Sequence, residues 1–261
     1  MERDYSIRNS LMFALVMQHE DICKGFIERL FEGRKVKKLE VKSKIDLSTE
    51  KTIIADIAAK TIRLDVLFTD EDAWYDIEMQ VENERFLPKR MRYYASSMDI
   101  KQLDRGKDDY DSLKKNYVIF ICMFDYFKMD KPIYQFENYD IKNGIRLGDD
   151  AYKIMLNINC SEEKVPDYLK GLYAYIKDKV VPSNDKLLSN IDGLVAEYSK
   201  DREVDSIMTL YDEMKYRERR SYEDGKSEGK LDTAKKMKED SLPVDLIMKY
   251  TGLSIEEIEK L

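Results

Sequence analysis

The chain has 261 residues, of which 43% are hydrophobic and 37% are charged, and its formal net charge is -7. This composition indicates a sizeable core under a strongly hydrated surface, and the negative balance argues against a protein that coats nucleic acid through bulk electrostatic attraction. One histidine and three cysteines without a C-x-x-C pair argue strongly against a zinc site.

The sequence also indicates where the protein works. Its longest apolar stretch, residues 117–124, is far too short to cross a bilayer and is typical of a buried strand. No secretion leader is recognisable. Cys23, Cys122 and Cys160 are scattered along the chain. We therefore expect a cytoplasmic protein without a membrane partner, whose cysteines are reduced thiols in the core.

The first third of the chain predicts a helix followed by strands. Residues 6–31 carry apolar side chains at helical spacing on or near one stripe, namely Leu11, Leu15, Ile22, Phe26 and Leu30. From about Val36 the pattern changes to that of short strands. We place these strands within residues 37–45, 61–68 and 74–81.

A second helix and a fourth strand follow. Pro88 fits the first turn of a helix that runs to Gly106, and residues 116–124 form the next strand. The order is therefore helix, three strands, helix, strand, which predicts an α/β core. A strand-helix-strand crossover between parallel strands would be right-handed.

Past Val181 the sequence becomes charged and helical, without strand signals. Ser254 and Glu257 have the spacing of a capping box in front of a last short helix. The pattern favours a helical interaction or oligomerisation tail over a helix-turn-helix that reads DNA. We divide the chain into a core domain, a helical extension and a tail of short helices, at residues 1–180, 181–225 and 226–261.

Two acidic residues lie within the most apolar strands. If the turn between these strands is centred between Glu71 and Asp72, Asp65 lies opposite Glu78. Alternate residues then form an apolar face, which consists of Leu64, Val66, Phe68, Ile77, Met79 and Val81. The other face is polar and presents Arg63, Asp65, Asp76, Glu78 and Gln80.

Facing carboxylates repel each other across a strand pair. A divalent cation removes this conflict, and Mg²⁺ is typically held by one or two carboxylates together with water and substrate phosphate. Arg63 beside Asp65 offers an alternative, a salt bridge on a solvated face of the sheet. The spacing alone supports both interpretations equally.

The spacing of Asp65 from the Glu-x-Gln triplet at residues 78–80 resembles that of the PD-(D/E)XK nuclease superfamily. In particular, it is similar to that of the Rpn-type recombination-promoting nucleases, also called PD-(D/E)XK family transposases. Further blocks resemble this group in the same order, namely MFALVM (12–17), LPKRMRYYASSMD (87–99), YVIFICMFDYF (117–127) and IYQFEN (133–138). The resemblance implies a restriction-endonuclease-like core of helix, three strands, helix and strand, with a helical C-terminal extension.

The resemblance also implies roles for individual residues. Asp65 and Glu78 would be metal ligands, and the backbone carbonyl of Met79 would add a third ligand. Gln80 stands where many members of the superfamily carry lysine; it can hold the attacking water by hydrogen bonds but brings no positive charge. Glu20, on the first helix, would be an additional acid at the metal.

The reaction implied is the Mg²⁺-dependent hydrolysis of a DNA phosphodiester by an endonuclease associated with recombination or transposition, with Mn²⁺ as an alternative ion. A double-strand break made by one active site per chain would suggest a homodimer. The rival interpretation is a catalytically weak or inactive DNA-binding or regulatory protein that keeps the nuclease fold. Gln80 and the negative net charge favour this rival.

The predicted second helix carries a basic face. Arg90, Tyr94, Ser97 and Lys101 fall at helical spacing on one side, so Arg90 and Lys101 could contact the DNA backbone. In the alternative interpretation, apolar and aromatic residues of this helix pack on the sheet and the basic residues are solvated. The residues that would pack are Met91, Tyr94 and Met98.

Overall fold

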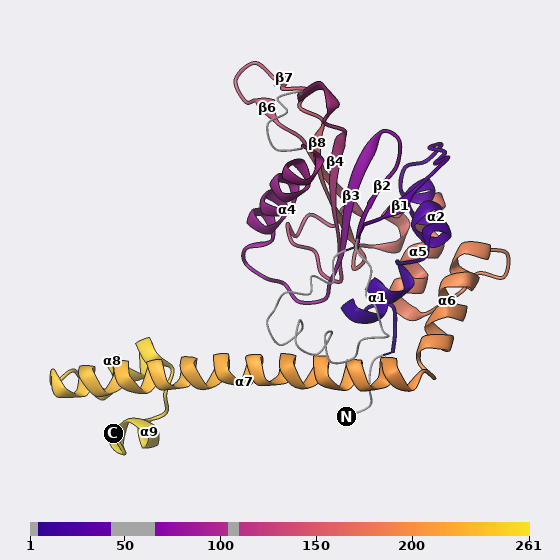
Figure 1. Ribbon diagram of the computed structural model, residues 1–261. Coiled ribbons are helices and arrows are strands. Elements are labelled where there is room, and N and C mark those ends of the chain that lie inside the picture. Colours follow the sequence, from indigo (N-terminus) through magenta and orange to yellow (C-terminus); the bar gives the residue numbers. More distant parts are fainter. Residues whose placement is uncertain (1–4, 43–65, 104–109) are drawn as a thin grey trace. The chain divides into compact units, whose positions relative to one another are not determined.

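The computed structural model describes residues 5–42, 66–103 and 110–261. The part of the chain up to Asp205 forms a compact unit around a six-stranded sheet with the order β1-β2-β3-β4-β8-β5 (Figure 1). β3 runs parallel to β4 and β4 parallel to β8, whereas the other pairs are antiparallel. The strands are β1 (Glu40–Val41), β2 (Val66–Thr69), β3 (Ala73–Gln80), β4 (Lys115–Cys122), β5 (Ile133–Phe136) and β8 (Ala151–Asn157).

Helices cover both faces of this sheet (Figure 1). Helix α4 (Leu87–Gln102) lies on one face, and its Pro88 stands in the first turn as predicted. On the other side lie α1 (Ser10–Val16), α2 (Glu20–Leu30), α5 (Asp167–Asp178) and α6 (Lys186–Tyr198). The predicted α/β class and the order helix, three strands, helix, strand are confirmed.

The segment predicted as one helix over residues 6–31 is two helices. Asn9 caps α1 through hydrogen bonds that its side chain accepts from two backbone N–H groups, and α1 ends before Met17. His19 is extended and precedes α2, whose first turn carries Glu20 and an aspartate that favour a helix N-terminus. The predicted apolar stripe is nevertheless buried along both helices.

The strands differ from the prediction mainly in length and number. The first covers only Glu40–Val41, and much of the predicted segment 61–68 lies outside the described residues. β3 ends at Gln80, so Val81 is exposed and does not extend the apolar face. Strands β5 and β8 were not predicted, nor was the exposed hairpin of β6 (Tyr139–Asp140) and β7 (Ile145–Arg146). Short 3₁₀ turns occupy Tyr110–Ser112 and Glu162–Lys164.

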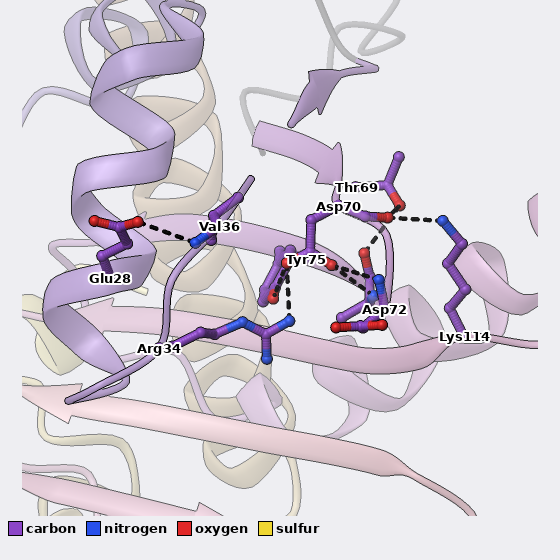
Figure 2. A network of polar contacts seen from close by, with 9 residues as sticks. Glu28, Arg34, Val36, Thr69, Asp70, Asp72, Tyr75 and Lys114 are labelled. Atoms are coloured by element: carbon purple, nitrogen blue, oxygen red, sulfur yellow. Dashed lines mark hydrogen bonds and ion pairs between the residues drawn. The ribbon is translucent and has the colours of Figure 1, made fainter. Parts of the chain in front are cut away.

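The turn between β2 and β3 is closed by the side chain of Asp70 (Figure 2). Its Oδ1 accepts hydrogen bonds from the backbone N–H groups of Asp72 at 2.9 Å and Ala73 at 2.7 Å. The Thr69 hydroxyl donates to the carbonyl of Ala73 at 2.9 Å. This turn pairs Val66 with Ile77, which is the predicted register, although Asp65 itself lies outside the described residues.

The same carboxylate joins the turn to the segment that follows α2. Asp70 Oδ2 accepts hydrogen bonds from Arg34 and from the Tyr75 hydroxyl, each at 2.8 Å, and the Lys114 ammonium donates to the Asp70 carbonyl at 2.7 Å (Figure 2). Burial acts to raise the pKa of Asp70, but these hydrogen bonds outweigh it and hold the pKa below its usual value. Asp70 therefore holds the hairpin in place as a buried anion.

The face of the sheet that carries Asp76, Glu78 and Gln80 is largely shielded from solvent, whereas Arg63 and Asp65 of the alternative salt bridge lie outside the described residues. Helix α4 covers this face with a hydrophobic cluster, which leaves Asp76 3% and Gln80 5% exposed. The cluster consists of Leu67, Leu87, Met91, Ala95, Met98, Val118, Phe120, Cys122, Tyr134 and Met155. The sheet therefore has two buried faces, and the polar residues of β3 lie at the edge of a second core.

The C-terminal region forms a compact unit of its own over residues 206–261. The C-terminal end of α7 (Arg202–Glu239) packs with α8 (Val244–Thr251) and α9 (Ile255–Glu259) around a small core of Ala234, Ile247, Leu253 and Ile258. The predicted capping box of Ser254 and Glu257 is confirmed. The predicted boundary between residues 225 and 226 falls within α7, which is continuous there. The division into residues 1–180, 181–225 and 226–261 remains a prediction.

Two expectations from composition can be compared with the described residues. Cys23, Cys122 and Cys160 are buried free thiols, as predicted. Among the helices described, none combines the length and the apolar character needed to cross a bilayer.

Candidate active site beneath helix α4

Glu78 and Gln80 lie at the C-terminal end of β3. Because side chains alternate along a strand, both point to the face that α4 covers. In the parallel pairing with β4, Glu78 lies beside Phe120 and Gln80 beside Cys122. Two side chains with oxygen ligands therefore lie next to each other at the carboxyl end of a central strand, where open α/β sheets generally bind their ligands.

Arg90, in the first turns of α4, contacts both of these side chains. Its Nη2 donates to Glu78 Oε1 in an ion pair, and its Nη1 donates to Gln80 Oε1 at 3.3 Å. Nη1 also pairs with Glu84 Oε2 at 2.8 Å, and Nη2 donates to the Tyr94 hydroxyl at 3.4 Å. One guanidinium thus joins two carboxylates, one amide and one phenol.

The pair of Glu78 and Arg90 is largely removed from water, with 14% and 28% of the side chains exposed. Burial alone would lower the pKa of Arg90, but Glu78 and then Tyr94 outweigh it and hold the pKa above its usual value. Burial, with a smaller effect from the Glu78 charge, raises the pKa of the Cys122 thiol to about 12. Arg90 is therefore a permanent cation in an ion pair with Glu78.

Aromatic rings hold the guanidinium in position. It lies over the rings of Phe120 and Tyr94, with centroids 5.5 and 5.8 Å away. Tyr94 packs edge-on against Phe120, while Met91 and Met98 are buried in the cluster beneath α4. The packing role considered for these three residues of α4 is therefore confirmed, whereas Arg90 faces the sheet and not open solvent.

The other predicted site residues are less closely associated. Asp65 lies outside the described residues. Met79 directs its side chain to the opposite, buried face, and its backbone lies within β3. Glu20 is exposed at the first position of α2, and Lys101 is exposed in the last turn of α4. No described hydrogen bond or ion pair connects Glu20 or Lys101 to Glu78.

The donor set on β3 suits a hard divalent cation. The carboxylate of Glu78 and the amide oxygen of Gln80 already accept hydrogen bonds from one guanidinium. Such oxygens are the ligands that Mg²⁺ prefers. Over residues 5–42, 66–103 and 110–261, no group of three or more acidic, histidine or cysteine side chains is placed to hold a metal. A complete site would therefore need Asp65 or ligands from substrate and water.

Sequence reasoning missed two features of this site. Asp76 is a second buried carboxylate on the same face, two residues before Glu78, and the alternation of β3 could have marked it as a site residue. The ion pair of Arg90 with Glu78 depends on how α4 docks on the sheet. No local pattern in the sequence encodes that docking.

Comparison with known proteins gives one match. Residues 3–239 match a family described as PD-(D/E)XK nuclease family transposase. No curated protein and no solved structure matches the chain.

Proposed function

Because this chain belongs to the PD-(D/E)XK nuclease family transposases, with a nuclease or transposition-related function, we propose that it is a divalent-metal-dependent DNA endonuclease. Its substrate is a DNA phosphodiester, Mg²⁺ is its ion with Mn²⁺ as the alternative, and its setting is recombination or transposition in the cytoplasm. The observation that carries the proposal is the position of Glu78 and Gln80, whose side-chain oxygens share one cation at the carboxyl end of β3.

In this proposal Asp65 and Glu78 hold the ion, together with the backbone carbonyl of Met79. Asp65 is the sequence neighbour of Val66, whose pairing with Ile77 agrees with the predicted register of the hairpin. When bound, the ion supplies positive charge at the phosphate and lowers the pKa of a water molecule. Glu20 is a further candidate acid.

The reaction is a hydrolysis. The water oxygen forms a bond to phosphorus, the bond from phosphorus to one ester oxygen breaks, one water proton is lost, and the leaving oxygen gains a proton. The Gln80 amide has two N–H donors and one acceptor oxygen, and in this reaction it orients the water. Lys101, exposed in the last turn of α4, and Arg90, beside the end of β3, are the basic residues proposed to contact phosphates of the DNA. Cuts in both strands would require two copies of the chain.

Plasmid nicking with Mg²⁺ or Mn²⁺ tests this proposal. Removal of a metal-ligand carboxylate in Asp65→Ala should lower the rate at least about 100-fold, because the charge that it positions acts on the transition state. Equal rates in the wild type and in Asp65→Ala would trace the activity to a contaminating nuclease. Chelation of the metal should abolish nicking of the wild type.

A second function is favoured by one observation, the neutral Gln80. A chain that retains the site but turns over slowly would act as a DNA-binding or regulatory protein. In that case the wild type would retain DNA in a mobility assay, with an affinity that falls with salt, and would show no metal-dependent nicking.

A further inference from the structure

The hydrolysis of a phosphodiester adds negative charge around phosphorus in the transition state, and a fixed cation stabilises that charge most when water is excluded. At the end of β3, the side chain of Gln80 is neutral. Among the described residues, the cation that contacts both Glu78 and Gln80 is Arg90 of α4. Within the described part of the chain, the positive charge in contact with these two side chains therefore comes from helix α4.

The donors of Arg90 are divided among four side chains, Glu78, Gln80, Glu84 and Tyr94. A guanidinium has five N–H donors in a plane and stays protonated at every working pH, so it can bind phosphate oxygens while it remains beside a carboxylate.

We propose that Arg90 is a catalytic residue of this nuclease, whose guanidinium contacts the reacting phosphate and supplies the positive charge that Gln80 lacks. It transfers no proton, and it stabilises the charge that develops on the phosphate oxygens. Because it is ion-paired with Glu78, the carboxylate proposed to hold the metal ion, it also opposes metal binding in the absence of DNA. This inference rests on the proposed nuclease function.

The charge-free variant Arg90→Met separates the effect of Arg90 on the reacting phosphate from its effect on metal binding. Methionine keeps apolar contact with Phe120 but removes the guanidinium. Titration with Mn²⁺ alone, followed by calorimetry and by thermal stabilisation, should show roughly tenfold tighter binding, since a cation no longer competes for Glu78. Plasmid nicking at saturating Mn²⁺ should fall by about 100-fold, because charge stabilisation of the transition state is lost.

A matched control is Arg29→Met. Arg29 forms a bidentate ion pair with Asp185 at 2.6 and 2.9 Å, and its side chain is 21% exposed, close to that of Arg90. This pair joins α2 to the N-cap of α6. Arg29→Met should lower the thermal midpoint while leaving Mn²⁺ affinity and the nicking rate unchanged below the melting range.

A rescue experiment tests the role of charge directly. In the Arg90→Met background, Gln80→Lys places an ammonium on the same face of β3 and should restore nicking by at least about tenfold. Arg90→Lys, which keeps the charge in place, should lose much less activity than Arg90→Met. If Arg90→Met does not fold, Arg90→Lys takes its place in the comparison with the wild type.

The outcomes distinguish this inference from the nuclease proposal itself. Unchanged Mn²⁺ affinity with reduced DNA affinity would make Arg90 an ordinary backbone contact and overturn the inference, as would a failed rescue by Gln80→Lys. A wild type that never nicks DNA would overturn the nuclease proposal. The Mn²⁺ titration would still decide whether Arg90 occupies the cation site.

Discussion

At the turn between β2 and β3, the Asp70 carboxylate accepts hydrogen bonds from Arg34, from the Tyr75 hydroxyl and from two backbone N–H groups. Its side chain is only 6% exposed. Because its pKa is lowered in the folded protein, ionised Asp70 stabilises the fold at any pH above the pKa of an unfolded aspartate, about 3.9. That contribution is lost as the pH falls through the lower pKa of the folded state.

We expect Asp70→Asn to lower the free energy of unfolding at pH 7 by about 2–4 kcal/mol, because it leaves the half-buried Arg34 without its counterion and removes a buried acceptor. Urea denaturation measures this loss. The difference in free energy of unfolding between Asp70→Asn and the wild type should become smaller below about pH 4, because Asp70 in the wild type becomes protonated there. The neighbouring Asp72→Asn is the control, since the exposed Asp72 takes part through its backbone N–H. A gap that stays constant with pH would contradict this role of Asp70.

At the scale of the element, helix α4 is held by apolar side chains on one of its faces. Met91 and Met98 are both 1% exposed; Met91 directly follows Arg90, and Met98 lies about two turns further along. This apolar face belongs to one cluster with Val118 and Phe120, which holds the helix on the sheet. The apolar contacts of α4 thus help to fix the position of a functional charge.

Met98→Ala should lower the free energy of unfolding by about 2–4 kcal/mol, since it opens a cavity in the core beneath α4. Ile100→Ala is the control on the same helix, because Ile100 is 76% exposed, and it should change stability by less than about 0.5 kcal/mol. Chemical denaturation of both variants measures the contrast. Similar losses in the two variants would mean that α4 does not pack as described.

At the scale of the whole molecule, the described chain contains two compact units, residues 1–205 and 206–261. The sheet has the core beneath α4, and the second unit has its own core around Ile247. When two units have separate cores, truncating a core side chain in one unit is expected to destabilise mainly that unit.

Ile247→Ala should therefore speed hydrogen exchange of the backbone amides of α8 and α9 on the order of 100-fold, which corresponds to about 3 kcal/mol. The amides of β3 and β4 should keep their protection. Met98→Ala should give the opposite pattern, and mass spectrometry of exchanged peptides resolves the two regions. Equal effects of Ile247→Ala on both units would show that they unfold as one.

The sequence predicted what local patterns encode. Alternation gave β3 and its two faces, Pro88 marked the start of α4, and the spacing of Ser254 and Glu257 gave the capping box of α9. The register of the hairpin followed from its turn.

Features that depend on tertiary contacts were missed. Strand β8 has four consecutive buried residues at its end and so shows no alternation there. The burial of Asp76 and the pairing of Glu78 with Arg90 arise from the docking of α4, which brings together residues 12 positions apart. Hydrophobic periodicity shows that α4 has an apolar face but does not show which strand that face meets.

The closed turn at Asp70 has a consequence for how relatives of this protein can vary in length. One residue gained or lost between β2 and β3 would turn alternate side chains of β2 toward the wrong layer of helices. The exposed hairpin of β6 and β7 is under no such restriction. Insertions and deletions should therefore accumulate between residues 137 and 150, while natural selection keeps the three-residue connection from Asp70 to Asp72 at constant length.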